Sequence, residues 1–262
     1  MRIKNLSIIV LNDRQDQLFE QALMSVAFAE QIIVLDQESA NDWQALEKKL
    51  KKLNPQLNFR LIFRKNPITD FAALRNKMIK KVSTPWLMFL DSDEILSQEN
   101  LKQLAELLND ELVDAYLLKR IDYFHQRKLK FGETGNYYSP RLARVNAIKY
   151  DRQVHEVAQI TGQVKKSNLI IKHFSHQNLA NFLLSVDQYA QLEANYRFAQ
   201  NIPYTKTKII LQAIFYPMGK FLLNYWLKLG FLDGFAGLCY AWLMSIHSLL
   251  VRIYLYEKYF LN

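Results

Sequence analysis

The sequence is poor in the residues that cross-link or loosen a chain. Its 262 residues include one cysteine, seven glycines and six prolines. The single Cys239 cannot close an internal disulfide, and its neighbours are large and apolar, which favours a reduced, cytoplasmic setting. The glycines and prolines form no linker or low-complexity block. No repeat of about 20 to 50 residues is present either, which argues against solenoid and propeller folds.

A long apolar run is also missing where a signal peptide would need one. The first apolar run, LSIIVL at 6–11, has only six residues and is followed by a polar turn rather than a small-residue cleavage site. We therefore expect a first strand at this position and no export. About half of the residues are hydrophobic, so the chain can bury a core of enzyme size.

Acidic residues are outnumbered by basic ones. The chain has 34 Lys and Arg against 25 Asp and Glu, a formal net charge of +9. Such a charge suits polyanionic partners: nucleotide phosphates, acidic lipid headgroups or nucleic acid. A helix-turn-helix pattern, a zinc pattern or a basic stripe with interleaved aromatics would favour nucleic acid, and none is found. We therefore expect no nucleic-acid partner.

Apolar runs and amphipathic segments alternate four times in the first 90 residues. The predicted strands are 6–11, 32–36, 59–63 and 86–90, and the predicted helices between them are 16–28, 42–53 and 70–81. This alternation predicts an α/β fold whose mostly parallel, Rossmann-like central sheet is flanked by helices. A helix after an N-cap at Ser97, an antiparallel extension and a helix at about 178–200 should complete a domain at 1–204.

Polar side chains follow the predicted strands directly. They are Asn12, Asp13, Asp36 and the cluster from Asp91 to Glu94. The carboxyl ends of parallel strands share one edge of a sheet, where ligands bind. Asp91 and Asp93 could both face a Mg²⁺ or Mn²⁺ ion that neutralises a diphosphate. The alternative is that these acids only end a strand and precede a helix.

An ordered series of segments extends over nearly the whole chain: LSIIVLNDRQDQLFEQALMSVAFAEQIIVLDQES (6–39), DFAALRNKMI (70–79), PWLMFLDSDEIL (85–96), SPRLAR (139–144), RQVHE (152–156), IKHFSH (171–176) and FLDGFAGL (231–238). Taken in this order, the segments resemble family-2 glycosyltransferases with the GT-A fold, in particular the lipopolysaccharide-core glucosyltransferase-like branch.

The resemblance implies roles on the donor side. Asp36 would bind the nucleoside, Arg75 and Asn76 the nucleotide, and Asp91 and Asp93 the ribose-diphosphate and the metal ion. Asn12 and Asp13 stand where the family has Asn-Glu. The segment DQESAN, at 36–41, departs from the family pattern by lacking its glycine and second acid. This departure bears on the identity of the sugar donor, for which a UDP-hexose is the expectation.

The resemblance also implies roles near the acceptor. Glu156 would be the general base that takes the proton of the acceptor hydroxyl in an inverting displacement. His155 could orient this base or bind a donor phosphate, or could be an ordinary half-buried histidine. Arg141 and Arg144 could contact the diphosphate or an acceptor phosphate. The histidines at 173 and 176 are three residues apart on a predicted strand and therefore lie on opposite faces, so only His173 could reach the cleft.

Residues 205–262 differ in character from the rest of the chain. Dense aromatic and aliphatic clusters with interspersed lysines, and breaks at Pro217 and Gly230, predict two or three helices. We expect them to lie in the interface of a membrane. A membrane span over 231–251, or packing on the sheet domain, are the alternatives.

These observations predict a metal-dependent, inverting glycosyltransferase that is peripheral on the cytoplasmic membrane face. It would move a sugar to a lipid-linked or lipopolysaccharide-type acceptor. A nucleotidyltransferase is a second reading, although the turn NDRQDQ lacks the glycine-rich basic loop expected there. A non-catalytic, membrane-associated scaffold is a third.

Overall fold

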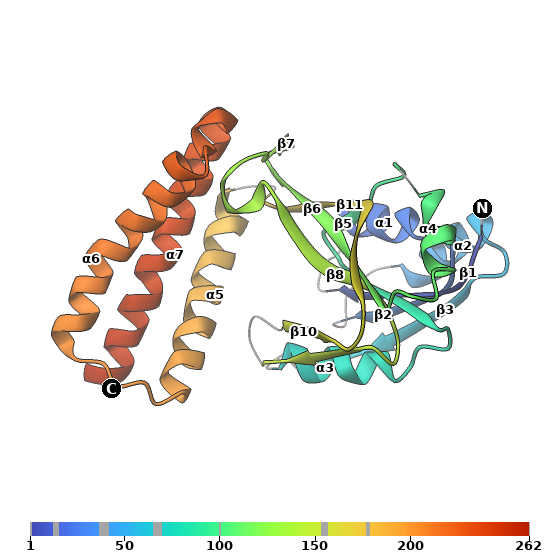
Figure 1. The fold of residues 1–262 in the computed structure, drawn as a ribbon, viewed down its shortest axis with the longest axis horizontal. Coiled ribbons are helices and arrows are strands. Elements are labelled where there is room, and N and C mark those ends of the chain that lie inside the picture. The colour runs from blue at the N-terminus through green and yellow to red at the C-terminus, as the bar shows by residue number, and fades with distance from the viewer. Residues whose placement is uncertain are drawn as a thin grey trace. The chain divides into compact units, whose positions relative to one another are not determined.

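The computed structural model describes residues 2–12, 16–36, 42–64, 70–99, 101–152, 157–176 and 179–261. Two compact units are formed, and Figure 1 shows the course of the chain through both. The first unit comprises residues 1–120 and 138–173, and the second comprises 121–137 and 174–262. The domain border expected at residue 204 stays a prediction; by its contacts, the helix at 179–199 belongs with the C-terminal helices.

A mixed β-sheet forms the centre of the first unit. Its strand order is β3-β2-β1-β4-β8-β6-β11-β5. The first four strands in this order are parallel: β3 (Asn58–Phe63), β2 (Ala29–Asp36), β1 (Ile3–Asn12) and β4 (Trp86–Asp91). The antiparallel extension continues through β8 (Tyr137–Arg144), β6 (Ala115–Phe124), β11 (Val164–His176) and the short β5 (Glu94–Leu96). The four predicted strands and the predicted extension are confirmed.

Side chains at alternate positions of the strands pack into two hydrophobic cores, one on each face of the sheet. Ile8 and Val10 of β1 belong to one core, whereas Ile9 between them belongs to the other. On β4, Met88 joins the first core and Phe89 the second. Since both faces of the sheet are covered, polar residues are not needed at alternate positions, and the strands read as continuous apolar runs.

Aspartates begin the helices that connect the parallel strands. Asp16 caps α1 (Gln17–Ser25), Asp42 caps α2 (Trp43–Leu53) and Asp70 caps α3 (Phe71–Ile79), each by accepting a bond from a backbone N–H three residues later. Such caps satisfy backbone donors that have no partner inside the helix.

Ser97 does not cap the next helix. Its backbone N–H donates to Ile170 O at 2.8 Å, so the residue still belongs to the sheet edge. The helix α4 (Gln103–Leu108) begins after a turn and has no side-chain cap. The expected helix start at Ser97 is therefore wrong by several residues.

Three helices dominate the second unit: α5 (Leu179–Ala199), α6 (Lys206–Leu222) and α7 (Gly234–Phe260). They run side by side, and α7 packs against both of the others (Figure 1). Pro217 lies inside α6 and does not break it; the chain turns after the π-helical segment η2 (Leu223–Leu227) and before the 3₁₀ turn η3 (Gly230–Asp233). One helical stretch in the described chain, Gly230–Phe260, is long and apolar enough to cross a membrane.

The turn between α6 and α7 depends on the close approach of two glycines. A Cβ atom built on Gly237 would lie 1.9 Å from the carbonyl oxygen of Gly230. We expect Gly237→Ala to lower the free energy of unfolding of the second unit by about 1 to 3 kcal/mol, because backbone must move. Gly219→Ala is the matched control: its Cβ meets nothing within 4 Å in a helix, and it should stabilise by about 0.5 to 1 kcal/mol. Thermal unfolding that gives both variants the same sign of change would contradict the packing described.

Candidate active site

The polar residues at the ends of three parallel strands meet at one edge of the sheet. In the register of the strands, Leu11 pairs with Asp91 and Asn12 pairs with Asp36. Asn12 Nδ2 donates to Asp36 Oδ1 at 2.6 Å, and Trp43 Nε1 donates to Asp36 Oδ2 at 3.2 Å. Asp36 is fully buried, so its carboxylate is held at this edge by two donors. The sequence predicted the edge and the two polar residues, but not Trp43.

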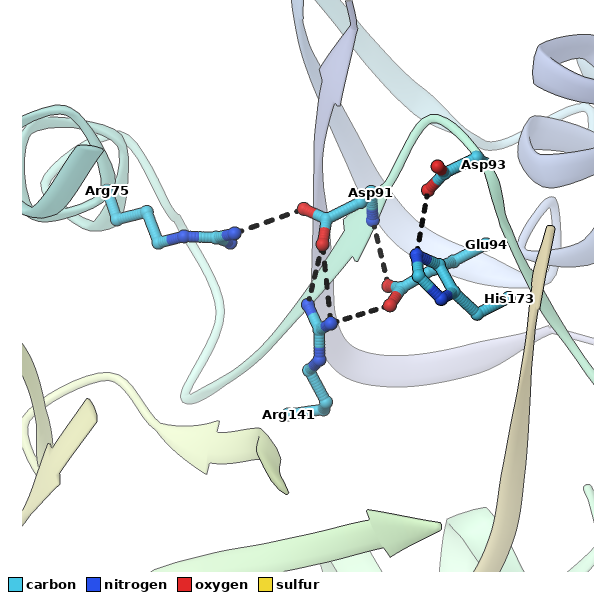
Figure 2. A network of polar contacts seen from close by, with 6 residues as sticks. All are labelled: Arg75, Asp91, Asp93, Glu94, Arg141 and His173. Atoms are coloured by element: carbon cyan, nitrogen blue, oxygen red, sulfur yellow. Dashed lines mark hydrogen bonds and ion pairs between the residues drawn. The ribbon is translucent and has the colours of Figure 1, made fainter. Parts of the chain in front are cut away.

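Asp91 is held between two arginines (Figure 2). Arg75 Nη2 donates to Asp91 Oδ1 at 3.0 Å, while Arg141 donates from Nη1 and Nη2 to Asp91 Oδ2 at 3.2 and 3.3 Å. Burial by itself would raise the pKa of Asp91, but the two guanidinium groups outweigh it and hold the pKa well below its usual range. The Asp91 side chain remains 33% exposed, so its ionised carboxylate is accessible to a ligand at the carboxyl edge of the sheet.

Aromatic rings fix Arg75 in its place. Its guanidinium lies 4.8 Å from the centre of the Phe89 ring and 5.4 Å from that of the Tyr150 ring. Such cation–π contacts orient a planar guanidinium as well as attract it. The carboxylate of Asp91 is therefore bound by a cation that has little freedom to turn. Neither ring carried a signal in the sequence.

Asn76 contacts the backbone of Tyr150. Its amide group donates to Tyr150 O at 2.8 Å and accepts from Tyr150 N at 2.9 Å, which ties α3 to the strand β9 (Ile148–Asp151). Both bonds go to backbone, and Tyr150 in turn faces Arg75. Asn76 therefore positions Tyr150, and its expected contact with the nucleotide stays a prediction.

Glu94 is the hidden member of the cluster. It is fully buried, accepts from Arg141 Nη2 at 2.6 Å through Oε1, and accepts from the Asp91 backbone N–H at 3.0 Å through Oε2. Burial raises the pKa of this carboxyl group, and the attraction of Arg141 opposes the rise only in part. Glu94 thus closes the turn that follows β4 and holds Arg141 against Asp91, a role that the sequence did not reveal.

Asp93 lies on the other side of the turn, beside His173 (Figure 2). Asp93 Oδ1 and His173 Nε2 are 3.6 Å apart, and both side chains are mostly buried. Of the two histidines of β11, His173 is thus the one that the structure shows at this edge, as the strand spacing predicted. The side chain of His176 lies outside the described part of the chain.

The donor set fits a divalent ion in part. Two neighbouring ligands of a six-coordinate ion, each bound at about 2.1 Å, lie about 3.0 Å apart, which is close to but shorter than the 3.6 Å between Asp93 Oδ1 and His173 Nε2. The described residues include no group of three or more His, Cys, Asp or Glu placed to hold a metal. Since both oxygens of Asp91 accept bonds from arginine, Asp93 is the better placed carboxylate, and water and substrate phosphate would supply other ligands.

Arg144 does not belong to this edge. It pairs with Trp86 at the start of β4, the opposite end of the strand from Asp91, and its guanidinium lies over the Trp86 ring at 4.6 Å. Its Nε and Nη2 donate to Val113 O and Asp110 O, both at 3.1 Å. The structure therefore places Arg144 away from the strand-end acids, and its contact with a phosphate stays a prediction. Asp13, His155 and Glu156 lie outside the described residues.

The parallel strands, the antiparallel extension and the acids that follow β4 define the GT-A type of α/β fold. A mannosyltransferase from Pyrobaculum calidifontis, solved with GDP-Man and Mn²⁺, matches 99% of this chain and 88% of its own at a TM-score of 0.55 and 10% sequence identity. Staphylococcus aureus TarS matches 98% of this chain and 55% of its own, at a TM-score of 0.49 and 16% identity.

The chain belongs to Glycosyl transferase family 2, whose family model matches residues 7–162. A curated relative is the SPbeta prophage-derived glycosyltransferase SunS of Bacillus subtilis strain 168, which is 30% identical over 132 residues. This match covers 48% of the present chain. The chain spans only 28% of the length of that relative.

Proposed function

We propose that the protein transfers a sugar from a nucleoside diphosphate sugar, a UDP-hexose, to a glycan or lipid-linked acceptor of the lipopolysaccharide type. One observation carries this proposal: an ionised Asp91, fixed by Arg75 and Arg141, stands beside Asp93 and His173 at the strand ends of a family-2 fold. The site would act at the cytoplasmic face of a membrane, which the charge of +9 supports.

Each side chain of the edge has a definite task in this proposal. The three arginine bonds to Asp91 use three of its roughly four acceptor positions, so one position of Oδ1 can take a bond from a ribose hydroxyl. Asp36, fixed by Asn12 and Trp43, would bind the nucleoside. These carboxylates would position the donor before any bond breaks.

A Mg²⁺ or Mn²⁺ ion would be held by Asp93 and His173, and it would neutralise the charge that develops on the departing diphosphate. Glu156 is proposed as the base that takes the proton from the acceptor hydroxyl on the face opposite the leaving group, which inverts the anomeric centre. Arg141, already bound to Glu94 and Asp91, keeps the turn that carries Asp93 in place.

The first test is thermal unfolding with UDP, GDP and Mn²⁺, alone and in pairs. A ligand that binds only the folded state at about 100 times its Kd adds about 2.7 kcal/mol to the free energy of unfolding. We expect the largest rise in melting temperature with UDP and Mn²⁺ together, because the diphosphate completes the coordination of the ion. A larger rise in melting temperature with GDP than with UDP would indicate a GDP-sugar donor, the kind of nucleotide sugar with which the mannosyltransferase was solved.

The reaction products distinguish a glycosyltransferase from a nucleotidyltransferase. Incubation with UDP-sugar, Mn²⁺ and a lipid-linked acceptor should release UDP, whereas a nucleotidyltransferase would consume or release pyrophosphate. Absence of stabilisation by any nucleotide, with or without metal, would favour the non-catalytic scaffold and would refute sugar transfer by this chain.

A further inference from the structure

Helix α6 carries a row of exposed apolar side chains. Every fourth residue from 210 to 226 belongs to it, and each of the five is between 50% and 58% exposed: Ile210, Ile214, Met218, Leu222 and Trp226. Residues four apart are neighbours on a helix, and because each such step adds about 40° the row winds around the surface of α6 until it reaches Trp226 in η2. We call this set the α6 row. A row of this length on a helix exposed to water needs a partner, because contiguous apolar patches are rare on soluble surfaces.

The row leads into an apolar turn between α6 and α7, which we call the crown. Its six exposed residues are Trp226, Leu227, Leu229, Phe231, Leu232 and Phe235. Leu227 is 76% exposed and Phe235 is 74% exposed. Leu229 adopts a left-handed backbone with φ of 58°, which is unfavourable for a leucine. The crown therefore combines a strained backbone at Leu229 with large apolar side chains that are exposed to solvent.

Hydrogen bonds fix the backbone of the crown. The carboxylate of Asp233 accepts from the backbone N–H groups of Lys130 and Phe131, and Lys228 O accepts from Gly132 N at 2.9 Å. Next to them, Asn224 Oδ1 accepts from Glu133 N at 3.0 Å. These bonds anchor the turn to the segment 130–133, so the apolar side chains are displayed by a fixed backbone.

Basic side chains lie in the crown and in the segment bonded to it. Lys228 is exposed within the crown, Lys130 is exposed in the segment 130–133, and Arg127 and Lys128 are exposed just before that segment. Two acids of these segments are already engaged: Asp233 binds backbone N–H groups, and Glu133 pairs with Lys220 at 2.6 Å. The rim of the crown is therefore positive, which attracts anionic headgroups.

We propose that the crown, with the end of the α6 row that adjoins it, inserts into the headgroup and outer acyl region of one leaflet of an anionic bilayer. The basic rim then meets the lipid phosphates. A fluid lipid phase accepts a projecting apolar turn without a matching groove, and tryptophan with flanking lysines suits the boundary between headgroups and acyl chains. This inference deepens the proposed function by naming the membrane surface as a partner, but it can be tested without donor, metal or acceptor.

The test is sedimentation of the full chain with vesicles of phosphatidylcholine containing 30% phosphatidylglycerol, and with phosphatidylcholine alone, at about 0.05 and 0.5 M NaCl. We expect binding to the anionic vesicles that weakens with salt. The triple change Trp226→Ser, Leu227→Ser and Phe235→Ser should weaken it by about a hundredfold, since three large apolar side chains no longer enter the lipid. The triple change Arg127→Gln, Lys128→Gln and Lys228→Gln should mainly remove the preference for the anionic lipid.

Leu112→Ser is the matched control, because Leu112 is 78% exposed but belongs to the first unit and not to the crown. It should bind vesicles like the unchanged chain, and circular dichroism should show that all variants are folded. Equal binding by the crown variant and the unchanged chain would overturn the proposal. So would a crown-dependent dimer in light scattering with no vesicle binding, which would identify a second copy as the partner.

Discussion

Asp93→Asn is expected to reduce sugar transfer by at least about two to three orders of magnitude, the cost of losing one fixed group that stabilises transition-state charge. The amide keeps the size of the side chain but removes the negative charge that would bind the divalent ion with His173. The Asp93–His173 separation of 3.6 Å exceeds a hydrogen bond, so little folding stability depends on it. Initial rates of UDP release in Mn²⁺ would measure the loss, and the melting temperature should stay nearly constant.

The comparison variants for this prediction come from the same unit. Asp110→Asn removes an acid that pairs with Lys165 at 3.1 Å, away from the strand-end edge, and should leave the rate unchanged. His173→Gln should raise the Mn²⁺ concentration needed for half-maximal rate more than it lowers the rate at saturating Mn²⁺. Full turnover by Asp93→Asn, or a metal requirement that neither change alters, would remove Asp93 from the proposed chemistry.

The edge of the sheet could be predicted because a local pattern determines it. Continuous apolar runs identify parallel strands covered on both faces, and the polar residue after each run must then lie at the shared carboxyl edge. Asn12, Asp36 and Asp91 were placed together on this basis, and the strand register confirms it.

The partners of those residues could not be predicted in the same way. Arg75 reaches Asp91 from 16 residues away, and Glu94 meets an arginine 47 residues further along the chain. Tyr150, which faces Arg75, is 75 positions from it and looks like any other strand tyrosine. Contacts at such separations depend on how helices and strands pack, which a single sequence does not encode in any local period.

The different positions of Arg141 and Arg144 have a physical cause that the spacing contained. Arg141 and Arg144 are three residues apart on β8, and residues at that spacing on a strand point to opposite faces. The motif resemblance treated both arginines alike, although the same rule had separated His173 from the histidine three residues after it. Strand geometry therefore predicts that the two arginines do not share one site.

Arg141→Met should strongly destabilise the first unit. Arg141 is a buried cation that pairs with Asp91 and with the fully buried Glu94. Methionine fills similar space but leaves Glu94 without its cation, and such a broken buried pair costs about 3 to 5 kcal/mol. Denaturant unfolding followed by circular dichroism would measure the loss, against Lys149→Met, which breaks an exposed pair and should cost less than about 0.5 kcal/mol.

The dependence of this loss on pH identifies its origin. Burial already raises the pKa of Glu94, and removal of Arg141 raises it further. A carboxyl group whose pKa is higher in the folded than in the unfolded state disfavours folding once pH exceeds the unfolded value. The destabilisation by Arg141→Met should therefore be largest near neutral pH and should shrink as pH falls toward the pKa of the unfolded state, because Glu94 takes up a proton in the folded state before that point. Adding Glu94→Gln to Arg141→Met should recover part of the loss at neutral pH and remove most of its pH dependence; a loss that stays constant with pH in both variants would assign the effect to packing around the guanidinium rather than to the buried carboxylate.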